Sequence, residues 1–325
     1  MPSGEDDLIA RYFKPLATAP GALGLTDDAA ILQAGGDDVV VTTDAIVAGV
    51  HFLPDDPPDT VARKVLRVNL SDLASKGADP AGFVLTLALR DVSEAWLAPF
   101  ARALGEDADQ FSCPLLGGDT VSTPGPAMIS VTAFGRVPLG RMVRRSTARA
   151  GDVIVASGTI GDAVLGLAIL KGERGPFDDD AAARAALIER YRVPQPRVAL
   201  AHAVRDHASA AMDVSDGLMG DLAKLCAASG VSAVVDAASV PLSTPAGTWL
   251  AGDPSLVTRL VSGGDDYEIL CTVPENRLAA FEAAARSAGV SVRVIGRIVA
   301  GEAAPQLVDA GNRKIPLDRQ SYSHF

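Results

Sequence analysis

The sequence predicts an α/β (α+β) fold built as two α/β domains. The chain has 325 residues, more than one compact core usually holds. Val-rich runs typical of buried strands alternate with stretches of helical apolar spacing, which is the pattern of α/β domains. The composition changes at residues 137–151, which carry four arginines, Pro138 and Gly140. We take this segment as the junction and expect one domain at residues 1–147 and a second at 148–325.

The first half is expected to contain three strands and two helices. We expect strands at 38–43, 82–89 and 128–134 and helices at 61–75 and 94–109. The first strand is rich in valine and ends in a polar Thr-Thr-Asp sequence. The first helix has apolar residues at helical spacing and is followed by Lys76-Gly77, which is a C-terminal stop signal.

The second half repeats this organisation. We expect strands at 152–156, 231–236, 269–273 and 292–298, a short strand ending at Asp213, and helices at 162–171, 181–191, 197–205, 218–229 and 276–288. An acidic turn at 177–180 precedes the second of these helices. No tandem short repeat is present in the sequence.

The charge and the cysteine content exclude several classes of protein. The formal net charge is −11, which argues against an extended surface for nucleic acid or an anionic membrane. The 3 cysteines are far apart and form no CxxC pair, so we expect neither disulfides nor a thiolate zinc site. The N-terminus is acidic, unlike a signal peptide, and no apolar run approaches the roughly 20 residues of a membrane helix. We therefore expect a soluble cytoplasmic protein. A small anionic substrate stays open, because metal ions can locally invert the sign of an acidic site.

Aspartate closes a series of short Gly- or Thr-rich motifs, most of which follow an apolar run. The motifs are Thr26-Asp27-Asp28, Thr42-Thr43-Asp44, Asn69-Leu70-Ser71-Asp72, Gly117-Gly118-Asp119, Asp213-Val214-Ser215-Asp216-Gly217 and Gly263-Gly264-Asp265-Asp266. If the carboxylates converge, two of them about 4 Å apart repel by roughly 4 kcal/mol at an effective dielectric near 20. Cations would then be needed, and hard oxygen ligands suit Mg²⁺, which usually brings a phosphate.

The common nucleotide-binding signatures are absent from the sequence. No Gly-Lys dipeptide occurs, so there is no Walker A loop, and neither a G-x-G-x-x-G βα turn nor the protein-kinase motifs are found. A phosphate would therefore have to be held by metals, Gly-rich backbone and arginine.

Each motif also has an ordinary structural explanation. Thr42-Thr43-Asp44 can be a polar strand terminus rather than two hydroxyls and a carboxylate facing one cation. Asp72 shares a helix face with Asn69, but it can simply pair with Lys76 at i,i+4. Gly117-Gly118 permits close backbone approach to a phosphate, although alone it favours a tight turn.

The remaining motifs leave similar alternatives open. The segment 213–217 resembles the start of an EF-hand loop, but Lys224 occupies the twelfth position, where a bidentate Glu is required. A strand-to-helix turn with two carboxylates and Ser215 near a helix N-terminus is the functional interpretation, and simple N-capping is the alternative. His51 closely follows the Thr-Thr-Asp cluster, although a lone His is usually a satisfied polar residue. The arginines of 141–149 are either a solvated linker or a source of a contact to a nucleotide phosphate.

Taken in order, these residues resemble the thiamine-monophosphate kinase family of the aminoimidazole-ribonucleotide synthetase-like superfamily. The resemblance runs from residues 7–13 to the end of the chain. Its most specific stretches are residues 42–52 and 69–80, and residues 213–217 and 262–268 add to it.

The resemblance implies that the γ-phosphoryl group of ATP is transferred in line, with the assistance of several Mg²⁺ ions, to thiamine monophosphate, giving thiamine diphosphate and ADP. It also implies a homodimer that pairs the sheets of its N-terminal domains, so residues 1–147 would bind ATP and Mg²⁺ and form the dimer. By motif, the implied metal ligands are Asp28, Thr42, Thr43, Asp44, Asp72, Asp119, Asp213 and Asp216. The implied ATP contacts are Gly118, Asp119, Arg145 and Ser215, and the implied contacts to thiamine monophosphate are His51, Asp265 and Tyr322. No catalytic residue distinct from the metal ligands is implied.

Two positions depart from the family pattern. Thr26 stands where the family commonly has Gly, which affects the geometry of Asp28. Asp265 stands where Glu is usual and is one methylene shorter, so its contact with the substrate is the one to test.

Three other functions remain as alternatives. One is another ATP-using synthetase of the same superfamily, of the purine-pathway type. A second is a non-catalytic protein that binds divalent cations. A third is a two-metal phosphatase, for which histidine ligands beside the carboxylates are scarce.

Overall fold

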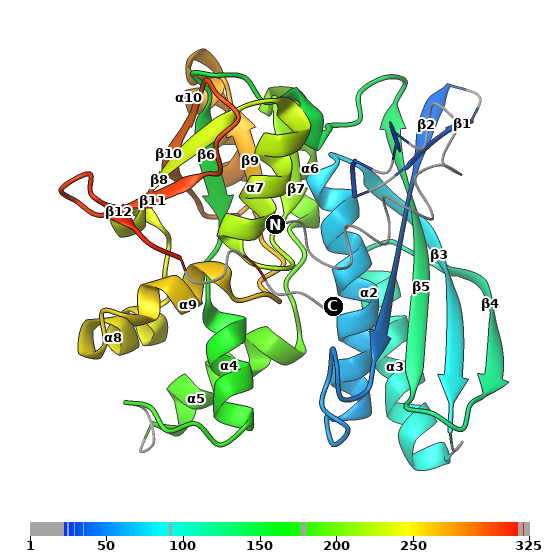
Figure 1. The fold of residues 1–325 in the computed structure, drawn as a ribbon. Coiled ribbons are helices and arrows are strands. Elements are labelled where there is room, and N and C mark those ends of the chain that lie inside the picture. The colour runs from blue at the N-terminus through cyan, green and yellow to red at the C-terminus, as the bar shows by residue number, and fades with distance from the viewer. Residues whose placement is uncertain are drawn as a thin grey trace.

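Two sheets organise the two halves of the chain. The structure, a computed structural model, describes residues 23, 24, 26–28, 30–34, 36–90, 93–176, 180–317 and 321. The first sheet has the strand order β1-β2-β5-β3-β4, and the second has the order β12-β11-β8-β10-β6-β9-β7. Within them only β3 with β4 and β11 with β8 pair in parallel among the described strands. Figure 1 shows the two sheets on opposite sides of helix α2.

The elements of the first half alternate between strand and helix. They are β1 (Ala30–Ala34), β2 (Asp37–Val47), α2 (Pro58–Ser75), β3 (Asp79–Leu89), α3 (Glu94–Gln110), β4 (Leu115–Ser122) and β5 (Met128–Pro138). The second half begins with β6 (Val153–Ser157), α4 (Asp162–Leu170), α5 (Ala181–Arg192), α6 (Ala201–His207), β7 (Ala210–Asp213), α7 (Leu218–Ser229) and β8 (Ser232–Asp236). It ends with α8 (Thr244–Gly252), α9 (Leu256–Ser262), β9 (Ile269–Val273), α10 (Leu278–Ser287), β10 (Val292–Val299), β11 (Gln306–Val308) and β12 (Lys314–Ile315).

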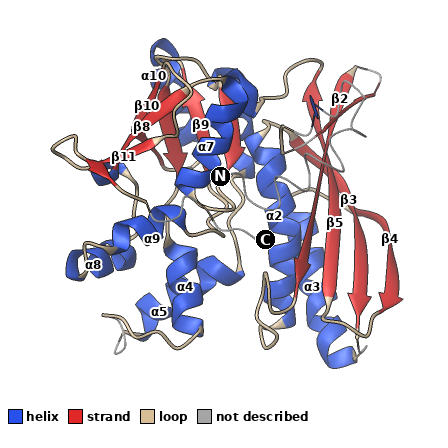
Figure 2. Ribbon diagram, viewed as in Figure 1, coloured by secondary structure: helices blue, strands red, loops and turns tan. Residues whose placement is uncertain are grey.

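The first sheet has one covered face and one open face. Helices α2 and α3 lie on the covered face, and no described helix lies on the other (Figure 2). The inward residues of β5 are buried and alternate with more exposed ones, as a strand side-chain period of two requires. All residues of β4, at the edge of this sheet, are exposed. The open face and this edge are therefore available for contact with another surface.

Helix α2 is buried between the two halves. It contacts β2 and β5 of the first sheet and also β7, β9 and α6 of the second half. Its last fifteen residues, 61–75, are buried apart from Arg63, and they include polar and charged side chains as well as apolar ones. A helix enclosed on all sides cannot place its polar residues in water, so they must find partners across the boundary between the halves.

The second sheet carries helices on both faces. Leu218, Leu222 and Leu225 of α7 pack with β6, β7 and β8 in one core cluster. Phe281 of α10 and Val204 of α6 belong to a second core cluster. This cluster contains the residues of β6 and β7 that alternate with those of the first cluster, so it lies on the opposite face of the sheet. Helices α4, α5, α8 and α9 form a separate apolar cluster, and they lie together below the second sheet in Figure 1. No described helix combines the length and apolar composition needed to cross a membrane.

Most predicted elements are present, but several predictions about their limits were wrong. The strand expected at 38–43 continues to Val47, so Thr42, Thr43 and Asp44 lie inside β2 and not at its end. The glycine motif expected to form a turn is part of β4. The helix expected at 197–205 is a short 3-10 turn, Val198–Leu200, followed by α6.

Six described strands and α-helices were not predicted from the sequence: β1, β4, α8, α9, β11 and β12. The acidic turn expected at 177–180 lies outside the described residues except for Asp180. The side chain of Asp180 caps α5 by accepting hydrogen bonds from the N–H groups of Ala182 and Ala183.

Candidate active site

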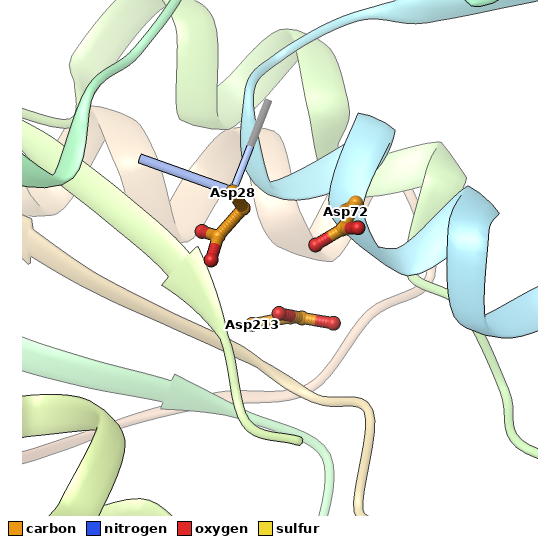
Figure 3. Close-up of side chains that lie close together, drawn as sticks. All are labelled: Asp28, Asp72 and Asp213. Carbon is orange, nitrogen blue, oxygen red and sulfur yellow. The ribbon is translucent and has the colours of Figure 1, made fainter. Parts of the chain in front are cut away.

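Three aspartates from distant parts of the chain converge between the two halves. Asp28 precedes β1, Asp72 lies in α2, and Asp213 ends β7. Each offers a carboxylate oxygen, and these oxygens lie within 4.8 Å of one another. Figure 3 shows the three side chains pointing into one space. Three hard oxygen donors at this spacing fit a divalent cation such as Mg²⁺.

The electrostatics of the cluster favour a cation. Burial raises the pKa of Asp213 to about 7, and the charges of Asp221 and Asp44 add to this effect. Burial, followed by the charges of Asp213 and Asp44, raises the pKa of Asp72 well above its usual value. A carboxylate beside other carboxylates ionises reluctantly, and a divalent cation reverses this effect.

Two basic side chains partly compensate the cluster. The buried Lys76 Nζ lies 2.7 Å from Asp27 Oδ1 and 2.8 Å from Asp28 Oδ2, and it donates to the carbonyl of Ala211. Arg145, implied as an ATP contact, forms an ion pair with the other carboxylate oxygen of Asp28. The i,i+4 pair of Asp72 with Lys76 is not formed, because Lys76 reaches Asp27 and Asp28 instead.

Strand alternation divides the Thr-Thr-Asp motif between the two faces of the first sheet. Thr42 points toward α2 and donates a short hydrogen bond to the carboxylate of Asp72. Asp44 shares this face, because side chains alternate along β2 and the charge of Asp44 helps to raise the pKa of Asp72. The backbone N–H of Asp44 bonds to Asn69 Oδ1 at 3.1 Å. The hydroxyl of Thr43 faces away and contacts Thr132 Oγ1 at 2.9 Å. The prediction that both hydroxyls face one cation with Asp44 was therefore wrong.

Asp119 does not join the cluster within one chain. It pairs in register with Thr86, which pairs with Ser130, which pairs with Ala45. Residues in one such row project from the same face of a sheet, so Asp119 lies on the open face, opposite to Asp44. Three strand spacings also separate it from β2, roughly 14 Å. The expectation that Asp119 meets the other aspartates is not met within the single chain.

Gly118 approaches its neighbouring strand closely. A Cβ atom at Gly118 would lie 2.0 Å from the carbonyl oxygen of Leu85, whereas one at Gly117 would meet nothing within 4 Å. The glycine at 118 is thus required by the packing of β4 on β3.

The turn at 213–217 leads from β7 into α7. Asp221 organises it by accepting hydrogen bonds from the N–H groups of Ser215, Asp216 and Gly217. Asp216, implied as a metal ligand, is ion-paired with Lys224. Lys224 therefore neutralises the carboxylate of Asp216 within this turn. Asp216 lines the pocket described next and is not part of the three-aspartate cluster.

A pocket of about 400 Å³ adjoins the cluster and is lined by both halves of the chain. Its lining includes Asp44, His51, Ser215, Asp216 and Asp265. These five residues were all singled out from sequence motifs. Tyr322, the remaining implied substrate contact, lies outside the described residues.

Three charged residues of the site were missed by sequence reasoning: Lys64, Lys76 and Asp221. Lys64 lies on the same helix face as Val61 and Val68, so its apolar neighbours could have indicated burial. Lys76 was considered only as a helix stop and as an i,i+4 partner of Asp72. Asp221 carries no motif, and no signal in the sequence distinguishes it.

The two halves match two family models. The model described as AIR synthase related protein, N-terminal domain, matches residues 26–137, and the corresponding C-terminal domain matches residues 149–306. The fold and the acidic interdomain site therefore place the chain among the AIR synthase related proteins. The hydrogenase maturation protein HypE in complex with ATP shares this fold at a TM-score of 0.67 and 20% identity.

More similar relatives specify the family within this class. A thiamine-monophosphate kinase of Caulobacter vibrioides is 48% identical over 307 residues, covering 93% of this chain and 86% of the relative. That of Escherichia coli K12 is 40% identical over 328 residues, covering 100% and 99%. A solved structure described as AaThiL complexed with AMPPCP and TMP matches with a TM-score of 0.85 at 28% identity, covering 99% and 96%. The chain belongs to the thiamine-monophosphate kinase family.

Proposed function

We propose that the protein transfers the γ-phosphoryl group of ATP to thiamine monophosphate, giving thiamine diphosphate and ADP. The observation that carries this proposal is the convergence of Asp28, Asp72 and Asp213 beside a pocket that both halves line. The relatives named above support the substrates, since one of them is described in complex with AMPPCP and TMP. The same relatives favour this reaction over a purine-pathway synthetase or a non-catalytic cation-binding protein.

The acceptor chemistry explains why no separate general base is required. A phosphate monoester has a second pKa of about 6, so its attacking oxygen is largely ionised near pH 7. The difficulty is to bring two polyanions together in an acidic site. Mg²⁺ ions, when bound, supply the charge neutralisation and orientation that in-line phosphoryl transfer needs.

The chain supplies the ligands. We assign Asp28, Thr42, Asp44, Asp72 and Asp213 to the metal sites, because they lie together on the inner side of the first sheet. Asp216 would hold a further ion after release from Lys224. Ser215 and Arg145 would contact ATP, and both lie next to these aspartates.

Acceptor binding is assigned to the pocket. His51 and Asp265 line it and would contact thiamine monophosphate together with Tyr322. Ile46, Val68, Val164 and Leu167 supply apolar walls beside these polar groups. An apolar pocket with a few directed polar groups is the usual form of a small-molecule site.

We further propose a homodimer that pairs the open faces of the N-terminal sheets. The exposed strand β4 and its large apolar side chains Leu115, Leu116 and Val121 support this arrangement. It would also give Thr43, Gly118 and Asp119 a role, since all three belong to the open face or its edge and would act in ATP and metal binding across the interface.

We also propose a domain boundary and a compartment for the protein. We propose the division at residues 147 and 148, because the first sheet ends at Pro138 and the second begins at Val153. A reducing cytoplasm is consistent with Cys113, Cys226 and Cys271, which are all buried and free.

One assay tests the proposed reaction. Purified protein is incubated with ATP, Mg²⁺ and thiamine monophosphate, and thiamine diphosphate is detected directly. We expect equal amounts of thiamine diphosphate and ADP, and no turnover in the Asp44→Ala variant. ADP release without thiamine diphosphate, or turnover with formylglycinamidine ribonucleotide instead, would refute the proposal.

A further inference from the structure

Lys64 is a buried cation beside the pocket, and the proposed function gives it no role. We propose that Lys64 is a positioning residue, which holds Asp265 at the pocket wall and thereby sets the affinity for the cationic acceptor substrate. The inference rests on the proposed function, because it concerns how the acceptor is bound.

Lys64 contacts two segments that line the pocket and, in addition, helix α5. Its ammonium group lies 3.3 Å from Asp265 Oδ1 and donates a 2.8 Å hydrogen bond to the carbonyl of His51. It also lies over the ring of Tyr191, 3.9 Å from the centroid. Lys64 and His51 belong to the first half of the chain, whereas Tyr191 and Asp265 belong to the second. The lysine is thus bound to both walls of the pocket.

Asp265 depends on its surroundings for its conformation. Its φ of 71° lies in the left-handed region, which costs a residue other than glycine about 1 kcal/mol or more. The backbone N–H of Asp265 donates to the carbonyl of Ser215 at 2.8 Å, which fixes the turn. The ion pair with Lys64 fixes the direction of the carboxylate, whose side chain is 26% exposed at the pocket.

Of the two carboxylates near Lys64, Asp265 is its main ion-pair partner. Burial lowers the pKa of Lys64, and the carboxylates of Asp265 and Asp56 oppose this shift. Asp56 is held by Arg192, whose Nε lies 2.6 Å from its Oδ1. The ammonium of Lys64 and the carboxylate of Asp265 therefore stabilise each other at the pocket wall.

The position of this carboxylate suits the acceptor. Thiamine monophosphate carries a flat thiazolium cation in addition to its phosphate. A carboxylate among the apolar side chains of Val68, Val164 and Leu167 can bind such a cation, provided that the carboxylate is held toward it. Lys64 lies behind Asp265 and has a 2% exposed side chain, so it acts through Asp265 and does not contact the substrate itself.

A double-mutant cycle tests the inference on the full chain with ATP, Mg²⁺ and thiamine monophosphate. We expect Lys64→Met to raise the KM for thiamine monophosphate by about tenfold or more. The KM for ATP and kcat should change by less than about threefold, because Lys64 contacts Asp265, His51 and Tyr191, none of which is assigned to ATP or metal. Asp265→Asn should raise the same KM, and the double variant should match Asp265→Asn alone, since the lysine acts through the aspartate.

Controls separate this role from a structural one. Arg63→Met removes a cation from the same helix whose partners are Glu106 and Asp107 of α3, and it should leave the KM for thiamine monophosphate unchanged. If Lys64→Met does not fold, Lys64→Gln replaces it, because the amide can still donate to the carbonyl of His51. An unchanged KM for thiamine monophosphate, an equal rise in the KM for ATP, or multiplying effects in the double variant would overturn the inference. Wild-type protein that makes no thiamine diphosphate would instead overturn the proposed function.

Discussion

A substitution of Asp72 can test its proposed role in metal binding without destabilising the fold. Its carboxylate accepts a hydrogen bond from Thr42 and lies among Asp28, Asp44 and Asp213. An asparagine at this position would keep an acceptor for Thr42 while removing one of several repelling charges. The loss of this negative charge should therefore weaken metal binding without lowering the stability of the metal-free protein.

We expect Asp72→Asn to lower kcat by about two orders of magnitude or more. The melting temperature of the metal-free variant should equal or exceed that of the wild type, and the rise caused by Mg²⁺ should be much smaller. Steady-state kinetics and thermal unfolding with and without Mg²⁺ measure both effects. Asp206→Asn, in an exposed ion pair with Arg141, is the control and should behave as wild type. Near-normal turnover of Asp72→Asn would remove it from the metal site.

The raised pKa of Asp213 makes the effect of Mg²⁺ depend on pH. Because the pKa is raised from 3.8 to about 7, the folded protein binds a proton that the unfolded chain has lost. The metal-free fold therefore loses stability as the pH rises through this range. A metal ligand must be deprotonated, so Mg²⁺ displaces that proton more easily at higher pH.

We expect the rise in melting temperature caused by Mg²⁺ to be larger at pH 8 than at pH 6. Thermal unfolding at a series of pH values, with Mg²⁺ and with a chelator, measures this difference. Asp213→Asn should reduce it, since one titrating carboxyl is removed while Asp72, whose pKa is also raised, remains. An equal Mg²⁺ effect at both pH values in the wild type would contradict the assignment.

Sequence motifs identified the aspartates of the site but not the direction of each side chain. Asp28, Asp72 and Asp213 could be selected because each belongs to a recognisable motif. Thr43 was grouped with Thr42 because the strand was expected to end at residue 43. Beyond the end of a strand, neighbouring side chains no longer have to point to opposite faces of the sheet. Only the continuation of β2 to Val47 shows that the two hydroxyls lie on opposite faces.

At the scale of elements, the pairing of β4 with β3 depends on one glycine. A Cβ at Gly118 would approach the backbone oxygen of Leu85 to 2.0 Å, and backbone cannot move aside as a flexible side chain can. A Cβ at Gly117, one residue earlier, would have nothing within 4 Å. The two neighbouring glycines thus form a matched pair for substitution.

We expect Gly118→Ala to destabilise the protein by about 1–3 kcal/mol, the usual cost of overpacking. Gly117→Ala should change the stability by less than about 0.5 kcal/mol, as exposed positions generally do. Chemical denaturation of both variants measures the difference. Equal stability of the two variants would show that Gly118 is not required for packing and would leave ligand binding as its explanation.

The elements that the sequence did not reveal are short or contain residues that disfavour their type. Helix α8 has Pro245 near its start and glycines at 247 and 252, so its pattern does not suggest a helix. Helix α9 has only seven residues, and β12 has two. Helices α8 and α9 are stabilised by the apolar cluster that they form with α4 and α5. Contacts between such distant segments cannot be predicted from the local sequence. Helix α7, by contrast, was predicted with the correct limits, because apolar residues recur at helical spacing along its whole length.

At the scale of the whole molecule, the proposed site draws residues from two faces of the N-terminal sheet. Asp213 lies with Asp72 on the covered side, whereas Asp119 projects from the open side. A single chain cannot bring them together without disrupting β4. In the proposed two-fold dimer, Asp119 of each chain would instead act in its partner's site, which it would reach around the edge of the sheet, where β4 lies.

Complementation between two inactive variants tests this arrangement. Asp119→Ala and Asp213→Ala should each lower turnover by about two orders of magnitude or more. When the two chains are coexpressed with different tags, half of the dimers are mixed, and each mixed dimer carries one intact site if Asp119 acts across the interface. We therefore expect about a quarter of the wild-type activity in the mixture and about half in the purified mixed dimer. Sedimentation velocity should show a dimer for both variants. A mixed dimer without activity would place Asp119 and Asp213 in the same chain's site, and a monomer in solution would remove the interface altogether.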